Sequence, residues 1–243
     1  MNGDNAHERI TDVDSTKKQA RFAGWLYLAL AITGVFNLIY VPSTLFVFGD
    51  ATATAENITS SEPLFRMGIL SGLVSNVLFV FLVLALYRLL KEIGRRQAIL
   101  MVALVVISVA TTFANTFNQI AALIILSGAD FLSPFDKPQL DAIAYLFLRL
   151  HSQGLQIIQI FWGLWLFPFG LLVYKSRFIP KVLGILLIIA GFGYCLSSFT
   201  FLVLSQYQTA ISPFITLLEA GELPIILWLL IVGAKDQSVE VQI

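Results

Sequence analysis

Six apolar stretches, each long enough to cross a lipid bilayer, constrain what this chain can fold into more than any other feature. A hydrocarbon core of ~30 Å takes ~20 helical residues, and the stretches cover about 22–46, 67–90, 98–126, 142–174, 180–204 and 212–233. Isolated strands are excluded because lipid leaves their backbone groups unpaired, and the alternating segments of a β-barrel do not occur. The sequence therefore predicts an all-α fold, an integral membrane bundle of six transmembrane helices.

The low fraction of charged residues also indicates a membrane protein. Charged residues make up 12% of the chain, whereas a soluble domain carries about 25%. The formal net charge is zero, which gives no basic surface for nucleic acid. The single cysteine, Cys195, excludes an intrachain disulfide and a cysteine-rich metal site.

The basic residues predict an orientation. Twelve of the 15 fall in the N-tail, in 88–96, in 175–181 or in the C-tail, and three, Arg66, Lys137 and Arg149, fall in the other connections. Because Lys and Arg concentrate in cytoplasmic loops, both termini are predicted to be cytoplasmic, N-in/C-in. The domain prediction is a cytoplasmic tail over 1–21, one six-helix transmembrane domain over 22–234 and a cytoplasmic tail over 235–243.

The outer connections are predicted to be longer and more polar, at 47–66 and 127–141. Asp136 with Gln139 three residues later indicates a capping box at the start of the fourth spanning helix. That helix, some 33 residues to about Tyr174, is longer than the hydrocarbon core is thick. Gly154 and Pro168 are the candidate bend points.

Polar side chains inside the spans are costly in lipid and are treated as functional candidates. In all six predicted helices they fall on the outer half of the span, which predicts a polar cavity that opens outward and is closed toward the cytoplasm. The candidate cavity residues are Asn37, Arg66, Asn76, Asn115, Asn118, Gln119, His151, Gln156, Gln159, Glu219 and Glu222.

Each candidate also has a structural interpretation. Asn and Gln in membrane helices often serve only as interhelical hydrogen bonds, worth ~0.6 kcal/mol on average. Glu222 precedes Pro224, which frees the carbonyl of Ala220, and a protonated Glu222 would help to satisfy that turn. His151 is either a structural histidine or a partner of Glu219, and Arg66 is placed to neutralise a carboxylate or hold an anionic headgroup.

Three functions are consistent with these residues. The leading hypothesis is a polytopic protein that binds a small or lipid-like ligand in the outward-open cavity. The first alternative is an intramembrane enzyme of the outer leaflet, with His151 and Glu219 as acid and base and Arg66 as anion holder. The second is a structural or assembly partner of another membrane protein, using the aromatic residues Phe161, Trp162, Trp165, Phe167 and Phe169. The catalytic residues are unknown, because no phosphate loop, nucleophile elbow or His-Glu-x-x-His motif occurs, and no cofactor or metal is predicted.

Several stretches resemble a bacterial family of membrane proteins catalogued as domain of unknown function 4386. They include Leu64-Phe65-Arg66, Phe161-Trp162-Gly163-Leu164-Trp165 and the segments 20–27, 86–91, 178–187 and 222–233. The resemblance covers about residues 20–234. It implies a multi-pass protein of the bacterial cytoplasmic (inner) membrane with six spans, and it supplies no catalytic or binding residues.

Overall fold

The structure, a computed structural model, describes the backbone of residues 3–234 and the side chains of 16–234. Within this part of the chain 88% of the residues are helical and no strand occurs. Six helical segments are long and apolar enough to span a membrane: Thr16–Leu45, Glu62–Leu90, Arg95–Leu126, Lys137–Lys175, Lys181–Val203 and Ser205–Ile231. The predicted all-α fold with six membrane helices is confirmed. The predicted tail 235–243 lies outside the described residues.

The first span is one helical rod with a change of winding. Helix α1 (Gly3–Val35) passes into a π-helical turn, η1 (Phe36–Tyr40), and then into α2 (Val41–Leu45). Its start at Gly3 makes residues 3–21 of the predicted N-tail helical. Pro42 follows the wide turn and has no N–H to donate.

Helix α3 (Ala51–Ser60) lies in the connection that follows, which was expected to be a polar segment. Asp50 is its N-cap, and the carboxylate accepts a hydrogen bond from the Ala53 amide at 2.9 Å. The next two spans are the single helices α4 (Glu62–Leu90) and α5 (Arg95–Leu126). A short turn, η2 (Asp130–Leu132), then leads to the fourth span.

The fourth span consists of α6 (Lys137–Leu164) and α7 (Leu166–Lys175). The capping box is confirmed: the Gln139 amide donates to Asp136 Oδ1 at 2.9 Å, and the Asp136 amide donates to Gln139 Oε1 at 3.0 Å. The helix is interrupted at Trp165, three residues before Pro168, where the missing proline N–H weakens the helical ladder. Gly154, the other candidate bend point, lies inside continuous α6.

The fifth span is α8 (Lys181–Val203), and the sixth is interrupted twice. It begins with η3 (Ser205–Tyr207), continues as α9 (Gln208–Glu219), tightens at η4 (Ala220–Glu222) and ends as α10 (Leu223–Ile231). The tight turn comes directly before Pro224. The Leu223 amide donates to the Ala220 carbonyl there, so the acceptor that Pro224 frees is satisfied by the backbone.

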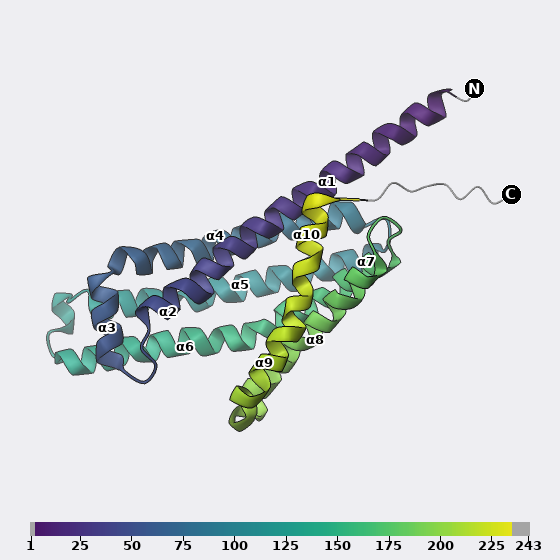
Figure 1. Cartoon of the computed structure of the whole chain (residues 1–243). Helices are drawn as coiled ribbons and strands as arrows, with labels where there is room; N and C mark the ends of the chain where they lie inside the picture. The colour runs from purple at the N-terminus through teal and green to yellow at the C-terminus, as the bar shows by residue number, and fades with distance from the viewer. Residues whose placement is uncertain (1–2, 235–243) are drawn as a thin grey trace. The chain divides into compact units, whose positions relative to one another are not determined.

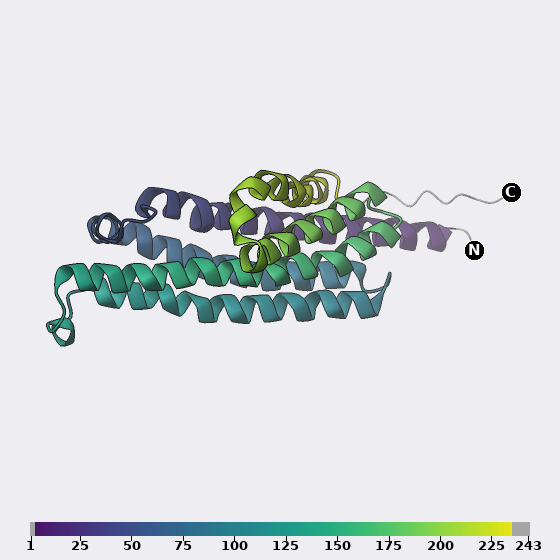
Figure 2. The ribbon, with the colours of Figure 1, turned by 90° about the horizontal axis from the view of Figure 1, so that it is seen from below.

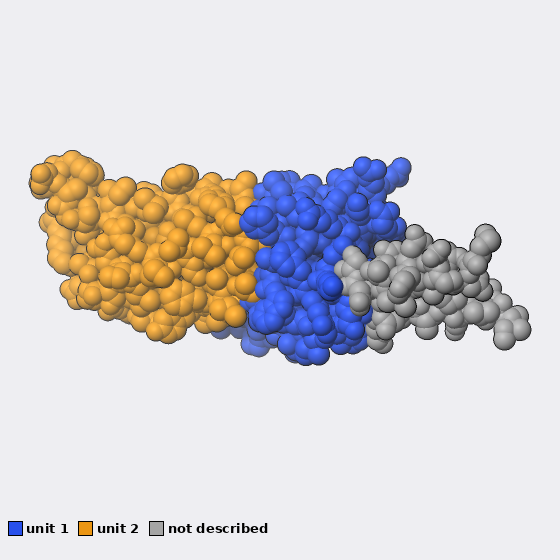
Figure 3. Space-filling model, turned by 90° about the horizontal axis from the view of Figure 1, so that it is seen from above, with its two compact units in different colours: residues 1–28, 79–107, 159–243 blue, residues 29–78, 108–158 orange. Residues whose placement is uncertain are grey.

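The chain groups into two compact units (Figure 3). Unit 1 comprises residues 1–28, 79–107 and 159–243, and unit 2 comprises 29–78 and 108–158. Four of the six spans contribute residues to both units. The prediction of one domain over 22–234 stays a prediction.

Unit 2 has an apolar core to which five helices contribute. Phe65 and Ile69 from α4 pack with Val41 from α2, Ile58 from α3 and Leu148 from α6, and Ala122 of α5 completes the cluster. The surface helix α3 is thus held by the same core as the spanning helices.

In unit 1, α8 packs against both α7 and α9 (Figures 1 and 2). Pairs of glycines bring α8 close to the fourth span: a Cβ on Gly163 would lie 2.5 Å from the Gly191 carbonyl, and one on Gly170 would lie 2.7 Å from the Gly184 carbonyl. Glycine pairs of this kind let membrane helices approach to backbone contact.

Large apolar side chains elsewhere face outward along the spans, among them Phe117 at 73% exposed and Leu217 at 70%. Such a surface suits lipid. Trp165 and Phe169, expected on an aromatic docking surface, are 2% and 0% exposed. That expectation is wrong for these two residues, because their rings stack on each other inside unit 1 with centroids 5.3 Å apart.

Candidate functional site

A carboxylate with two tyrosine donors joins three spans of unit 1. The Tyr27 hydroxyl of α1 donates to Glu222 Oε1, and the Tyr194 hydroxyl of α8 donates to Glu222 Oε2 at 3.0 Å. Tyr27 is 3% exposed, and Glu222 is half-buried. Each residue lies near the middle of its span. The prediction that Glu222 serves the loosened turn at Pro224 is therefore wrong: its two oxygens are engaged by tyrosines.

Further aromatic rings pack on the two tyrosines that bind this carboxylate. The Trp162 ring meets Tyr194 edge to face with centroids 6.2 Å apart, and Trp165 lies 6.2 Å from Tyr27. Phe79 in turn packs edge to face on Trp165 at 5.1 Å. These rings pack on the two tyrosines, whose hydroxyl groups are the hydrogen-bond donors to Glu222 found among the described residues.

Glu219, one helical turn before Glu222, is in a different position. Its side chain lies against α8, where a Cβ on Gly193 would be 3.3 Å from Glu219 Cγ. Glu219 Oε1 is buried and has no hydrogen-bond partner among the described residues. The Gln159 Oε1 and Thr200 Oγ1 atoms of the same unit are likewise buried without a partner in the described chain. Of these three unsatisfied atoms, the two from Glu219 and Gln159 are carbonyl-type oxygens that serve as acceptors.

The candidates of α5 and α6 in unit 2 bond to each other. Asn115 Nδ2 donates to the His151 carbonyl at 2.9 Å, and His151 Nδ1 lies 3.1 Å from the Asn115 carbonyl. A carbonyl oxygen can only accept, so Nδ1 carries the proton. Asn118 Nδ2 donates to Asn115 Oδ1 at 3.0 Å. The two contacts between Asn115 and His151 are interhelical hydrogen bonds, as in the structural interpretation, and the Asn118 contact lies within α5.

Gly154 makes this contact feasible. A Cβ at residue 154 would lie 2.4 Å from Asn115 Oδ1, so only glycine leaves room for the amide. Gly154 thus makes room for Asn115, and α6 continues through it without interruption. Gln119, 8% exposed, follows on α5, and Gln156 is half-buried on α6.

A second polar contact joins the first span to α4 in unit 2. Ser75 Oγ donates to Thr33 Oγ1 at 2.7 Å, and Ser71 Oγ donates to the Thr33 carbonyl at 3.0 Å. Asn37, in the π-turn, lies over Gly72, where a Cβ would be 2.9 Å from its Nδ2. Asn76 donates to the Gly72 carbonyl of its own helix at 2.8 Å.

Arg66 faces outward at the start of α4. Its Nε lies 2.6 Å from Glu62 Oε1 in an i, i+4 pair, and its side chain is 61% exposed. The guanidinium is therefore paired with a neighbour on its own helix.

The eleven candidates thus divide between the units. Gln159, Glu219 and Glu222 belong to unit 1, and the other eight belong to unit 2. Sequence reasoning does not find Tyr27 or Thr33, because a tyrosine or threonine in an apolar helix has no pattern that marks it. Tyr194 stands out as a polar residue of its span, but nothing in the sequence links it to Glu222, 28 residues away.

The fold and these polar contacts define a polytopic α-helical membrane protein. Residues 22–233 match the family described as "Domain of unknown function (DUF4386)". The chain belongs to this family.

A relative from Archaeoglobus fulgidus, named "Uncharacterized protein", is 40% identical over 80 residues. The match covers 33% of this chain and 46% of the relative, so it spans about half of that protein. No solved structure matches the chain significantly. Since this relative is archaeal, the bacterial inner membrane stays a prediction.

Proposed function

We propose that the protein binds a small or lipid-like ligand bearing N–H or O–H groups at Glu219, the polar centre of unit 1. The observation that carries the proposal is that Glu219 Oε1 is buried and has no hydrogen-bond partner among the described residues, and the same holds for Gln159 Oε1 of this unit. An unsatisfied buried acceptor costs about 1–3 kcal/mol, and more when it is charged. A ligand that donates hydrogen bonds would remove this cost.

The division between satisfied and unsatisfied groups supports this choice of centre. Glu222 has two donors, and Asn115 and His151 satisfy each other across α5 and α6. Those groups join helices and need no ligand. Glu219 lies one turn from the fixed Tyr27–Glu222–Tyr194 contact, so a ligand would meet a preorganised frame.

The outward opening of this centre follows from the predicted orientation and the depth pattern of the polar residues, and it is part of the proposal. The catalytic and assembly-partner alternatives remain predictions. Arg66, assigned to hold an anion in the catalytic alternative, is paired with Glu62.

The test is native mass spectrometry of the full chain released from membranes in mild detergent. Wild type is expected to carry a bound mass that Glu219→Leu loses, because leucine has no acceptor. Glu219→Gln separates two ligand classes: a cationic ligand is lost in both variants, whereas a neutral donor is retained by the glutamine.

Asn118→Leu is the matched control, since Asn118 is also a half-buried polar residue of a span but donates to Asn115. It is expected to retain the bound mass. A wild type with no bound species, or equal loss in Glu219→Leu and Asn118→Leu, would overturn the proposal.

A further inference from the structure

The connection between α7 and α8 forms a basic hollow at one end of unit 1. The hollow has a volume of about 580 Å³ and is lined by Tyr174, Lys175, Ser176, Arg177, Ile179, Pro180 and Lys181. Three of these seven residues are cationic and none is acidic. None of the three cations forms an ion pair within the described chain.

The backbone around the hollow is held in place from both sides. Ser176 is 3% exposed; its amide bonds to the Leu172 carbonyl at 2.9 Å, and its hydroxyl donates to the Val173 carbonyl at 2.8 Å. Ile179 is 3% exposed and anchors the middle of the connection. The glycine contact between Gly170 and Gly184 keeps the two helix ends close. The charges are therefore displayed on a fixed scaffold.

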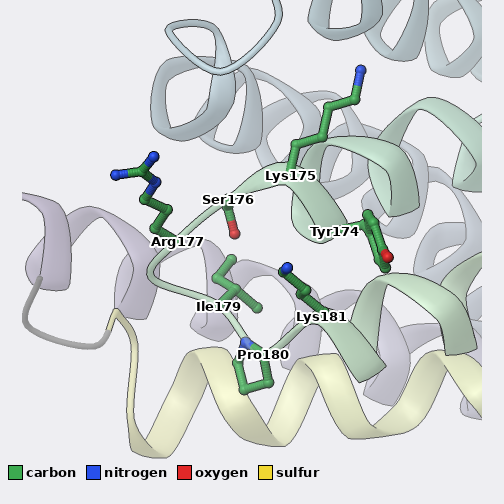
Figure 4. A pocket seen from close by; sticks show the side chains of 7 residues that line it. All are labelled: Tyr174, Lys175, Ser176, Arg177, Ile179, Pro180 and Lys181. Atoms are coloured by element: carbon green, nitrogen blue, oxygen red, sulfur yellow. The ribbon is translucent and has the colours of Figure 1, made fainter.

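The side chains leave room for an anion. Figure 4 shows Lys181 and Ser176 toward the middle of the hollow, while Lys175 and Arg177 extend from its rim away from the middle. The Lys181 ammonium lies 5.6 Å from the centroid of the Tyr174 ring, a cation–π contact that leaves its charge without an anionic partner. The N-cap of α8 is Pro180, which offers no side-chain acceptor to the first amides of that helix. The partial positive charge at the start of α8 adds a smaller attraction for an anion to that of the three cations.

The position in the chain indicates which anion is available. Lys175 ends one membrane span and Lys181 begins the next, so the hollow lies at the boundary between hydrocarbon and water. Lipid phosphates are concentrated at this level, and a Lys or Arg near an anionic surface is worth ≈ 1 kcal/mol. We propose that the hollow binds an anionic phosphate group, carried by a lipid headgroup or by a soluble phosphate ester.

The experiment measures phosphatidylglycerol binding to the full chain in detergent by native mass spectrometry. The variant replaces Lys175, Arg177 and Lys181 with glutamine. The matched control replaces Lys91, which follows α4, and Arg95 and Arg96, which begin α5, with glutamine. The hollow variant is expected to lose about tenfold or more in affinity, and the control is expected to stay within about twofold. Equal losses in both, or a hollow variant that keeps wild-type binding of phosphatidylglycerol, inorganic phosphate and glycerol 3-phosphate alike, would overturn the proposal.

Two further measurements keep the result interpretable. If circular dichroism shows that the triple variant is unfolded, Lys181→Gln is expected to lose about fivefold in affinity and Lys181→Arg to retain it. Wild-type affinity in Lys181→Gln would then contradict the proposal.

Inorganic phosphate and glycerol 3-phosphate identify the source of the phosphate group. If they bind without lipid and depend on the same residues, the ligand is a soluble phosphate ester; if phosphatidylglycerol alone does, it is a lipid. Binding of zwitterionic phosphatidylcholine to wild type as tightly as phosphatidylglycerol would overturn the proposal.

Discussion

At the scale of single residues, Glu222 is held by partners that lie far away in the sequence. Tyr27 and Tyr194 donate to its two oxygens from spans 195 and 28 residues distant. In membrane helices a hydrogen bond between spans averages ~0.6 kcal/mol, and bonds to charged groups reach higher values. Glu222 is therefore a structural contact of three helices, in contrast to Glu219.

Tyr27→Phe removes one donor and is expected to lower the free energy of unfolding by about 1 kcal/mol. Tyr40→Phe is the control, because Tyr40 is in the same span but is 52% exposed, and it should leave stability unchanged. Thermal unfolding in detergent compares the two. The double variant Tyr27→Phe with Tyr194→Phe is expected to lose more than the sum of the single changes, since the buried carboxylate then has no donor. Strict additivity would show that the two hydrogen bonds to Glu222 act independently of each other.

At the scale of elements, local patterns were predictable and contacts between helices were not. The Asp136–Gln139 capping box lies within four residues of sequence, and Pro168 marks an interruption of the fourth span. The π-turn Phe36–Tyr40 could not be predicted, because it accompanies the packing of Asn37 on Gly72 of another helix. Composition predicts only a polar connection where α3 lies, although Asp50 is an N-cap residue that signals a helix.

The glycine contacts of α8 make a prediction for packing. A Cβ on Gly184 would lie 2.6 Å from the Gly170 carbonyl and 2.7 Å from the Tyr174 amide. Both are backbone atoms, so Gly184→Ala must push the helices apart and is expected to destabilise the protein by about 1–3 kcal/mol. Gly34→Ala is the control, since a Cβ on Gly34 of α1 would have no neighbouring atom within 4 Å. Thermal unfolding in detergent should show a loss for Gly184→Ala alone. A similar effect of both substitutions would contradict close packing at Gly184.

At the scale of the whole molecule, hydropathy was sufficient for the number of spans but not for the site. An apolar run long enough to cross the bilayer is a property of one segment, and the sequence predicts all six, with ends that differ from the observed ones by up to seven residues, as for 212–233 against Ser205–Ile231. The sequence gives only the depth of each polar residue along its span. Which of them meet depends on helix rotation, and this separates the satisfied Asn115–His151 pair from Glu219.

The orientation of the spans determines on which side of the membrane each connection and each proposed site lies. The bias of basic residues places the connection 88–96 and the basic hollow on the cytoplasmic side, and the connections at 47–66 and 127–141 outside. With Cys195→Ala as background, Ser60→Cys and Ser127→Cys are expected to react with a membrane-impermeant maleimide in intact cells. Glu92→Cys, whose native side chain is 86% exposed, should react only after lysis.

The opposite result would have consequences for both proposed sites. Labelling of Glu92→Cys in intact cells, without labelling of Ser60→Cys, would place the termini outside and turn the polar centre of unit 1 toward the cytoplasm. The basic hollow would then face the outer leaflet and meet the lipids there. The contacts that form the basic hollow and the polar centre of unit 1 are local, so the chemistry of each site would be unchanged. The side of the membrane from which a ligand arrives would be reversed. Labelling of all three cysteines in lysed cells shows that each is accessible, so the intact-cell pattern reports orientation alone.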